Sequence, residues 1–266
     1  MLDLKKALDL IHGTTLGVGG YLHNYQQDVL IEKHKIGPDV QTNADLEAEK
    51  IFFKSIEEQY PDHNIFSEEF GYKDKNSEYT WYIDPLDGTI EYSRLSPLYL
   101  TTAALQTNSE VLVGSVYMPA VDQIYLASKK TKSTLNNKNI SVSKNKDLGQ
   151  SIIQFKNGNK KQSPEQQHQT FSILEKIALN TYRTHGFQNI AWNLCMVAQG
   201  VVDGFALLVD IGEKWQDVAA GLLIAKQAGA KITNRYGKSI KLKNFKDGII
   251  VTNGLIHDQL LDIINS

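Results

Sequence analysis

Cysteine is almost absent from this chain, since Cys195 is the only one among 266 residues. A lone cysteine forms no intramolecular disulfide, so a disulfide-stabilised scaffold is excluded. Its neighbours Leu194, Met196 and Val197 are apolar, and this setting predicts a buried core thiol rather than a nucleophile. The fold must therefore rest on a hydrophobic core, and a hydrophobic content of 41% is ordinary for a globular protein.

Long apolar runs and an excess of one charge are also lacking. No run approaches the roughly 20 apolar residues of a membrane-spanning helix, and the first residues lack the apolar core of a signal peptide. The formal net charge of −2 gives no electrostatic reason to expect nucleic acid as a partner. We therefore expect a cytoplasmic protein that binds neither membranes nor nucleic acid.

Complete glycine-rich nucleotide motifs are missing as well. Gly17 and Gly19 begin a dinucleotide-like pattern, but Leu22 occupies the third glycine position. Gly237 belongs to a P-loop-like ending in which Ile232 replaces the required first glycine. These gaps argue against an enzyme built around a nucleotide cofactor.

Apolar periodicity and turn signals differ between the two halves of the chain. In the first half we expect a helix over 2–25, continuous or broken near Gly19, a helix over 45–59, and strands over 81–83, 98–105, 111–117, 123–127 and 140–142. In the second half we expect strands over 151–155, 204–209 and 248–252, and helices over 165–179, 190–199, 217–227 and 257–264. This order predicts an α+β subdomain over 1–150 with a large, mostly antiparallel sheet, followed by a smaller α/β layer over 151–266.

The most informative segment is Trp81–Thr89, which reads Trp-Tyr-Ile-Asp-Pro-Leu-Asp-Gly-Thr. Asp84 and Asp87 flank a proline-stiffened turn, and with the Leu86 carbonyl they offer the oxygen ligands that magnesium prefers. The N–H groups of the Gly-Thr pair that follows are suited to phosphate oxygens. The segment predicts a magnesium-dependent phosphatase, although its residues are also those of an ordinary turn.

Further acidic residues flank this segment in the sequence. Glu68 and Glu69 precede it, and each alone reads as part of a solvated surface pair. Asp217 and Asp45 each stand where a helix begins, and Thr42 competes with Asp45 for the cap. Only the joint order and spacing of these residues indicates a shared site.

These motifs resemble the inositol monophosphatase family of lithium-sensitive, magnesium-dependent phosphatases, which also includes bisphosphate nucleotidases and sugar phosphatases. The resemblance covers nearly the whole chain. It rests on Thr42–Asp45 as the T-x-x-D element, Glu68–Glu69 as the E-E element, Trp81–Thr89 as the W-x-x-D-P-[IL]-D-G-T signature and Asp217–Gly221 as the end of W-D-x-A-A-G. It implies the α/β (α+β) sugar-phosphatase fold, a layered αβαβα sandwich, and a homodimer.

The resemblance also implies roles for single residues. Glu68, Asp84 and the Leu86 carbonyl would bind a first magnesium ion, while Asp84, Asp87 and Asp217 would bind a second. A weaker third ion would lie near Glu68. The expected metal set is therefore Glu68, Asp84, Leu86, Asp87 and Asp217.

Catalysis and substrate binding are assigned by the same resemblance. Asp45 and Thr89 would form a dyad that orients and helps to deprotonate the attacking water, with Glu68 as the third catalytic residue. The water would attack phosphorus in line, opposite the departing alkoxide, without a covalent intermediate. The expected substrate contacts are Asp87, Gly88, Thr89 and Asp210.

Two departures from the family pattern concern the second metal and the substrate. Gln216 separates Trp215 from Asp217, so either Gln216 takes the place of the tryptophan or one residue is inserted. The small-residue substrate element is not recognisable at Gln188–Ala191, and Ala206–Leu208 stands where an acidic inositol contact is expected. The hydrolytic half of the pattern is intact, whereas the substrate half is altered.

The preferred substrate is inositol monophosphate or a related polyol or sugar phosphate, and two alternatives stay open. Asp87–Tyr92 resembles the D-G-T-x-E-F of the 3′(2′),5′-bisphosphate nucleotidase branch, although Glu91 also fits the first turn of any helix. A non-catalytic regulatory protein with the same fold should have lost Thr89, Asp45 or a metal carboxylate, and none is missing.

Overall fold

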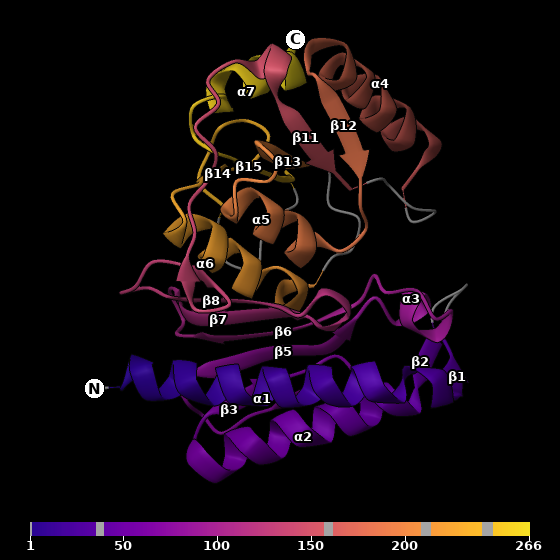
Figure 1. Cartoon of the computed structure of the whole chain (residues 1–266), viewed down its shortest axis with the longest axis vertical. Coiled ribbons are helices and arrows are strands. Elements are labelled where there is room, and N and C mark those ends of the chain that lie inside the picture. Colours follow the sequence, from indigo (N-terminus) through magenta and orange to yellow (C-terminus); the bar gives the residue numbers. More distant parts are fainter. Residues whose placement is uncertain (1, 36–39, 157–161, 209–213, 241–246) are drawn as a thin grey trace.

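The computed structural model describes residues 2–35, 40–156, 162–208, 214–240 and 247–266. These residues form five stacked layers in which helices alternate with two sheets (Figure 1). Such layering arises because a sheet has two faces to cover and each helix has an apolar stripe to bury. The predicted αβαβα sandwich is confirmed.

The larger sheet has eight strands in the order β10-β9-β8-β7-β6-β5-β3-β4. Neighbouring strands are antiparallel except for β3 and β5, which are parallel. The predicted large, mostly antiparallel sheet is therefore confirmed. Its strands are β3 (Asn64–Phe66), β4 (Tyr72–Lys73), β5 (Thr80–Asp87), β6 (Leu100–Gln106), β7 (Val111–Met118), β8 (Gln123–Ser128), β9 (Thr134–Leu135) and β10 (Lys138–Asn139).

Two long helices, α1 (Leu4–Tyr25) and α2 (Asn43–Gln59), cover one face of this sheet (Figure 1). The apolar sides of α1 and α2 bury Ile11 and Phe52 in one core with Trp81 and Ile83 of β5. α1 runs unbroken through Gly19, so the alternative of a break in the helix is wrong. A Cβ on Gly19 would lie 2.2 Å from the Tyr117 ring of β7, so glycine at this position permits close packing of the helix on the sheet.

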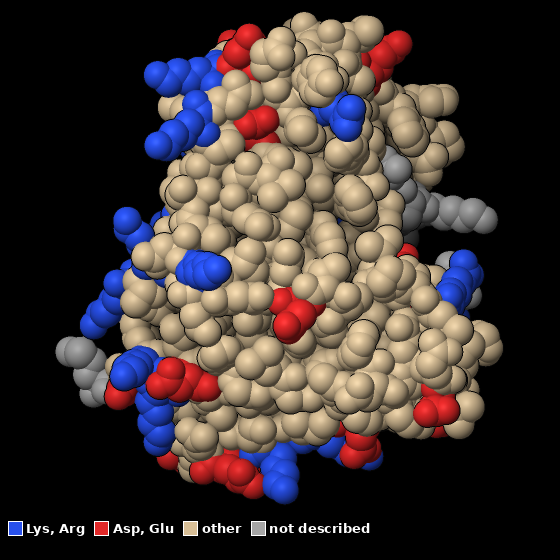
Figure 2. Space-filling model, viewed as in Figure 1, with Lys and Arg blue, Asp and Glu red and all other residues tan. Residues whose placement is uncertain are grey.

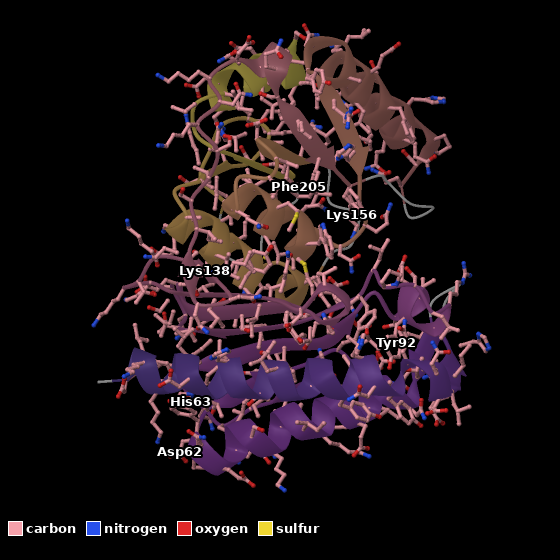
Figure 3. The ribbon with its side chains drawn as sticks, in the orientation of Figure 1. Asp62, His63, Tyr92, Lys138, Lys156 and Phe205 are labelled. Carbon is pink, nitrogen blue, oxygen red and sulfur yellow. The ribbon has the colours of Figure 1, made fainter. Side chains whose placement is uncertain are left out.

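The second sheet has five strands in the order β12-β11-β13-β15-β14. Its β12, β11 and β13 are parallel, while β15 pairs antiparallel with both β13 and β14. Phe205 of β13, labelled in Figure 3, is fully buried toward the helices between the sheets. The strands are β11 (Ile152–Phe155), β12 (Arg183–Gly186), β13 (Gly204–Leu207), β14 (Lys231–Thr233) and β15 (Ile249–Thr252).

Helices α5 (Ile190–Ala198) and α6 (Ala219–Gln227) lie between the sheets, and α4 (Pro164–Asn180) and α7 (His257–Asn265) cover the outer face (Figure 1). Cys195 of α5 is fully buried, as predicted, and burial raises the pKa of its thiol. The short elements are η1 (Gln26–Asp28), β1 (Ile31–His34), β2 (Val40–Thr42), α3 (Thr89–Ser93), η2 (Pro119–Val121), η3 (Leu148–Gln150) and η4 (Trp215–Asp217).

Several element boundaries differ from the sequence prediction. β5 extends to Asp87, because the strand tolerates the Asp-Pro-Leu-Asp segment through an irregularity in its pairing with β6. No strand covers 140–142, since β9 and β10 close a tight hairpin around Asn136 and Asn137, both at positive φ. The helix expected over 217–227 is split into η4 and α6.

Among the described residues, no helix combines the length and apolar character needed to cross a bilayer. On the face shown in Figure 2, acidic and basic side chains are interspersed, most of them near the rim and few of them in the middle. This distribution matches the small net charge. The division of the chain at residue 150 into two subdomains stays a prediction.

Candidate active site

The acidic loop lies at the end of β5, an inner strand of the larger sheet between β6 and β3. Gly88 follows β5 with a φ of +96°, and a Cβ there would lie 2.8 Å from the Leu98 carbonyl oxygen. Only glycine enters this conformation without strain. The turn brings the Thr89 hydroxyl back to the chain, where it lies 3.1 Å from the Leu86 carbonyl oxygen.

Parallel pairing of β3 with β5 brings the two acidic motifs together. Phe66 of β3 pairs with Tyr82 of β5, so Glu68 leaves the sheet level with Asp84. Parallel strands end at the same edge of a sheet, and residues that follow them are neighbours there. The third acidic residue, Asp217, is part of η4, which packs against β5 and β6.

Asp45 connects the start of α2 to the acidic loop. Thr42 is the N-cap: its side-chain oxygen accepts the Asp45 N–H at 3.3 Å, and Asp45 Oδ2 accepts the Thr42 N–H at 2.7 Å. The other carboxylate oxygen, Oδ1, accepts the Thr89 hydroxyl at 3.0 Å. Asp45 is therefore both a member of a capping box and a partner of Thr89.

The Asp45 carboxylate is tuned by its surroundings. Burial raises its pKa to about 6, against the opposing effect of the hydrogen bonds from Thr42 and Thr89. A carboxylate with this pKa is ionised at neutral pH and more basic than an exposed aspartate. It is therefore better suited to accept a proton during a reaction.

Asp84 is buried among other acidic side chains. Its pKa is raised far above the ordinary value, first by burial and then by the negative charges of Asp217, Asp87 and Glu68. Its Oδ1 accepts the Leu86 N–H at 3.2 Å. Mutual repulsion of this kind is relieved when a cation enters the group.

The Glu68 carboxylate forms ion pairs with two lysine side chains of the same chain. Its Oε1 lies 2.9 Å from the Lys35 ammonium and 2.8 Å from the Lys214 ammonium. Although burial raises the pKa of Glu68, the two lysines hold it below the ordinary value. No sequence motif points to Lys214, because its distance from Glu68 is short only in the folded chain.

Glu49 is a further buried acid that the sequence analysis did not single out. Its carboxylate accepts the N–H groups of Glu69 at 2.8 Å and Phe70 at 2.9 Å. Glu49 is fully buried and stands one helical turn after Asp45 on α2. That spacing is the only signal in the sequence. Glu49 fixes the segment that carries Glu68 and Glu69.

The donor atoms are suited to a hard cation, but their present arrangement is not a closed metal site. All predicted ligands offer oxygen, which fits magnesium. Within the described part of the chain, no three acidic, histidine or cysteine side chains are arranged to hold one ion. Glu68 faces two lysines, and Asp217 Oδ2 accepts the Lys214 N–H at 3.3 Å. A cation at Glu68 would require the contacts of Glu68 with these lysines to be broken.

The altered substrate half of the pattern lies beside the acidic loop. A Cβ on Gly88 would lie 3.1 Å from the Asn189 amide nitrogen, so the start of α5 adjoins this turn. Trp215 and Gln216 are both buried in η4, and the Trp215 indole N–H donates to Gln106 at 2.6 Å. The predicted substrate contact Asp210 lies outside the described residues.

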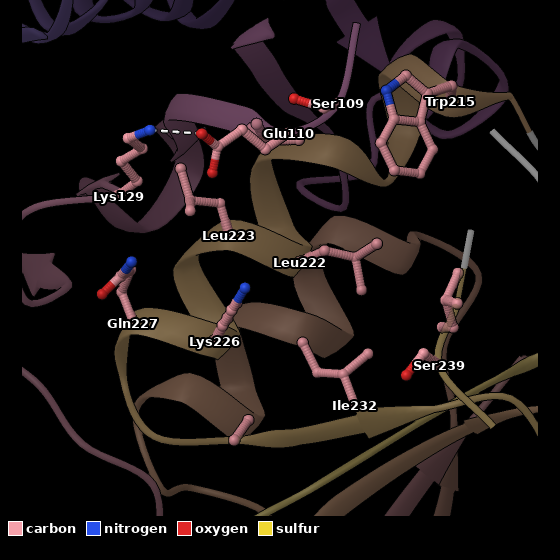
Figure 4. Close-up of a pocket in the computed structure, with 13 residues that line it drawn as sticks. Ser109, Glu110, Lys129, Trp215, Leu222, Leu223, Lys226, Gln227, Ile232 and Ser239 are labelled. Atoms are coloured by element: carbon pink, nitrogen blue, oxygen red, sulfur yellow. Dashed lines mark hydrogen bonds and ion pairs between the residues drawn. The ribbon is translucent and has the colours of Figure 1, made fainter. Parts of the chain in front are cut away.

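A cavity of about 670 Å³ opens on a different side of η4, between α6, β14 and the β6–β7 turn. Its lining includes Leu222, Ile232, Trp215 and Lys226 (Figure 4). None of the predicted metal or catalytic residues lines it. The cavity is therefore separate from the candidate active site.

The layered fold and the Asp-Pro-Leu-Asp-Gly-Thr loop beside a Thr–Asp pair define the class as a phosphatase that acts on small phosphate substrates. The family comparison is more specific. The model of the inositol monophosphatase family matches residues 14–266, and the chain belongs to that family. This family is in general metal-dependent.

Individual relatives agree with this assignment. The chain is 30% identical over 269 residues to the fructose-1,6-bisphosphatase/inositol-1-monophosphatase of Aquifex aeolicus, covering 99% of this chain and 97% of the relative. It is 32% identical over 200 residues to the Nus factor SuhB of Vibrio cholerae, covering 75% and 73%. Among solved structures, the inositol monophosphatase from Anabaena superposes with a TM-score of 0.85 at 27% identity, over 99% of this chain and 97% of that one.

Proposed function

We propose that this chain hydrolyses a small phosphate monoester in a magnesium-dependent reaction, with inositol monophosphate or a related polyol or sugar phosphate as substrate. One observation carries the proposal. The Thr89 hydroxyl lies between the Asp45 carboxylate and the Leu86 carbonyl, directly after two aspartates at the end of β5. A proton acceptor and a cluster of oxygen donors thus meet at one loop.

The Thr89–Asp45 pair supports the proton-transfer part of this reaction. Thr89 has one hydroxyl proton, which it directs toward Asp45 and the Leu86 carbonyl, so its oxygen lone pairs are left to accept a proton from water. As water loses its proton to Thr89, the Thr89 proton moves to Asp45, whose raised pKa favours accepting it. The pair would thereby orient the water for in-line attack on phosphorus.

The acidic residues would hold the cations. When bound, magnesium would supply Lewis-acid activation of water and would neutralise the charge of the phosphate. The predicted ligands are Glu68, Asp84, Leu86, Asp87 and Asp217, and their mutual repulsion at Asp84 supports this assignment. We assign two or three ions to the site on the basis of the family resemblance.

The phosphate group would sit at the turn after β5. The N–H groups of Gly88 and Thr89 open a short helix, where such donors have no partner within the helix. Asp87 and Asp210 complete the proposed substrate contacts. We also propose lithium sensitivity, a homodimer and a cytoplasmic location, each from the same resemblance.

A phosphate-release screen tests the proposal. The purified chain is assayed on inositol, sugar and nucleotide monophosphates with magnesium and with a chelator. We expect release from a polyol or sugar phosphate only with magnesium, and none from the Asp84→Asn variant. Equal release with the chelator would contradict the metal-dependent mechanism.

A bisphosphate substrate is a second candidate. Relatives are named fructose-1,6-bisphosphatase/inositol-1-monophosphatase, and the Lys35 and Lys214 ammonium groups beside Glu68 favour a second anionic group on the substrate. The 3′(2′),5′-bisphosphate nucleotidase alternative belongs to the same class. Including fructose 1,6-bisphosphate and a nucleoside 3′,5′-bisphosphate in the screen separates these substrates.

A regulatory role without hydrolysis is the third candidate, because relatives are named Nus factor. The Thr89–Asp45 hydrogen bond and the acidic cluster favour hydrolysis over this role. Absence of phosphate release from every substrate in the screen would favour the regulatory role instead.

A further inference from the structure

Two lysines from distant parts of the chain converge on one carboxylate oxygen. Lys35 follows β1, and Lys214 directly precedes η4. Their ammonium nitrogens lie 2.9 Å and 2.8 Å from the same Glu68 Oε1, and Lys35 also pairs with Glu69. This arrangement places two positive charges on a residue proposed to bind a cation.

The Lys35 and Glu68 side chains are partly shielded from water, whereas Lys214 is about as exposed as the lysines of other surface ion pairs. The side chains of Lys35 and Glu68 are 27% and 28% exposed, and that of Lys214 is 48% exposed. Partial burial strengthens an ion pair because solvent screens it less. A cation that binds Glu68 must therefore overcome the attraction between its carboxylate and the two lysine ammonium groups.

We infer that Lys35 and Lys214 compete with a divalent cation for Glu68, so that this lysine pair sets the metal affinity of the site. The inference rests on the proposed function, because it takes Glu68 as a metal ligand. A cation at Glu68 Oε1 would lie within a few ångströms of both ammonium groups, and like charges at that distance repel. Both lysines have to leave the carboxylate before the cation enters.

The lysine stems make such a change possible. Each ammonium ends a flexible four-carbon side chain, so it can withdraw without movement of the backbone. Lys35 keeps Glu69 as a partner when it leaves Glu68. Lys214 has no second ion pair among the described residues, although its charge also acts on Asp217 and Asp84, which are proposed ligands of the same site.

A metal-binding assay on the full-length chain tests the inference without relying on turnover. Mn²⁺ serves as the probe, and its free concentration is followed by electron paramagnetic resonance. We expect Lys214→Met to bind Mn²⁺ about fivefold more tightly than wild type, since it removes a repelling charge near the ion. Lys214→Arg keeps the charge and should retain the wild-type affinity.

Lys33→Met is the matched control for loss of charge. Lys33 is exposed on β1, two residues from Lys35, and pairs with no acidic side chain in the described part of the chain. It should change Mn²⁺ affinity less than twofold. Equal tightening by Lys33→Met and Lys214→Met would overturn the inference, because the effect would then come from net charge alone.

A double-mutant cycle with Glu68→Gln isolates the contact itself. In that background Lys214→Met should tighten Mn²⁺ binding clearly less than in wild type, since the shared carboxylate is gone and only the repulsion between Lys214 and the ion remains. A tightening as large as in wild type would overturn the competition. If wild type and Glu68→Gln bind Mn²⁺ equally, Glu68 is not a metal ligand. The proposed function is then wrong at this residue, and the inference is wrong as well. If Glu68→Gln binds weakly but Lys214→Met has no effect on wild type, only the inference fails.

Discussion

The two sides of the candidate active site are built in different ways. On one side Asp45, Thr42 and Thr89 are joined by hydrogen bonds of 2.6–3.3 Å that connect the start of α2 with the start of α3. On the other side Glu68 is held by lysine side chains that any cation must displace. The proton-transfer side is therefore fixed in advance, whereas the cation side has to rearrange when its ligand binds.

This difference separates two tasks of a phosphatase. Orientation of an attacking water gains most from groups that do not move, since reorganisation during the reaction adds to the barrier. Binding of an exchangeable ion tolerates movement, because competing charges adjust the affinity.

Replacement of Asp84 should have the largest effect on activity and the opposite effect on stability. Asp84→Asn removes a ligand assigned to both ions, so turnover should fall below about 1% of wild type. It also removes a buried charge repelled by Asp217, Asp87 and Glu68, so the melting temperature in a chelator should rise. Phosphate-release assays and thermal unfolding measure the two effects. A variant with near-normal turnover would show that the cation side does not depend on this residue.

Removal of the Thr89 hydroxyl should affect only the proton-transfer side. Thr89→Ala should lower kcat about 100-fold, as expected for loss of a positioned acid–base group, while Mn²⁺ affinity stays near wild type. Thr89→Ser keeps the hydroxyl and should recover much of the activity. Unchanged kinetics in Thr89→Ala would contradict the assignment of Thr89 to this side.

The raised pKa of Asp45 predicts opposite effects of pH on activity and on stability. The proton acceptor must be ionised, so kcat/KM should decline below about pH 6, the pKa that burial gives Asp45. Because this folded-state pKa lies above that of the unfolded chain, the folded protein binds the extra proton. The contribution of Asp45 to stability is thus full below about pH 4 and is lost as pH rises to about 6.

A pH–rate profile and urea unfolding at several pH values test both effects of Asp45. Asp45→Asn should be slow and should lack the acidic limb of the profile. An identical limb in that variant would assign the titration to another group, such as a cation ligand, and would weaken the comparison between the two sides.

The turn at Gly88 gives the smallest expected change. Gly88→Ala imposes a strained positive φ and brings a Cβ within 2.8 Å of the Leu98 carbonyl oxygen, so stability should fall by about 1–3 kcal/mol. Both sides of the site depend on this turn, and activity should fall with stability. Gly71→Ala is a useful comparison, because its φ is +76° but no atom lies within 4 Å of an added Cβ. Equal losses in the two variants would show that the contact with Leu98 has no effect.

The sequence predicts the residues of its motifs better than the residues that surround them in the folded chain. Asp45, Asp84 and Thr89 belong to contiguous motifs, so local patterns identify them. Lys214 and Glu49 act through contacts that form only when β3, β5, α2 and η4 pack together. Chain order alone does not specify such contacts.

The secondary-structure elements divide in the same way, into those with a clear local pattern and those that depend on distant parts of the chain. The long helices and the strands β6, β7, β8 and β15 follow clear apolar patterns and were predicted within a few residues. Strands β12 and β14 were missed, because Arg183–Gly186 and Lys231–Thr233 are short and largely polar. Their pairing depends on neighbours far away in the sequence, namely β11 and β15.

The most direct test of the central claim is phosphate release from inositol monophosphate as a function of magnesium concentration, by wild type and by Asp84→Asn. We predict that wild type releases phosphate at a rate that saturates with magnesium and vanishes in a chelator, and that the variant is inactive at every concentration. Wild-type release that continues in the chelator, or an Asp84→Asn variant with the same magnesium response, would contradict the claim that these acidic residues bind the catalytic cation.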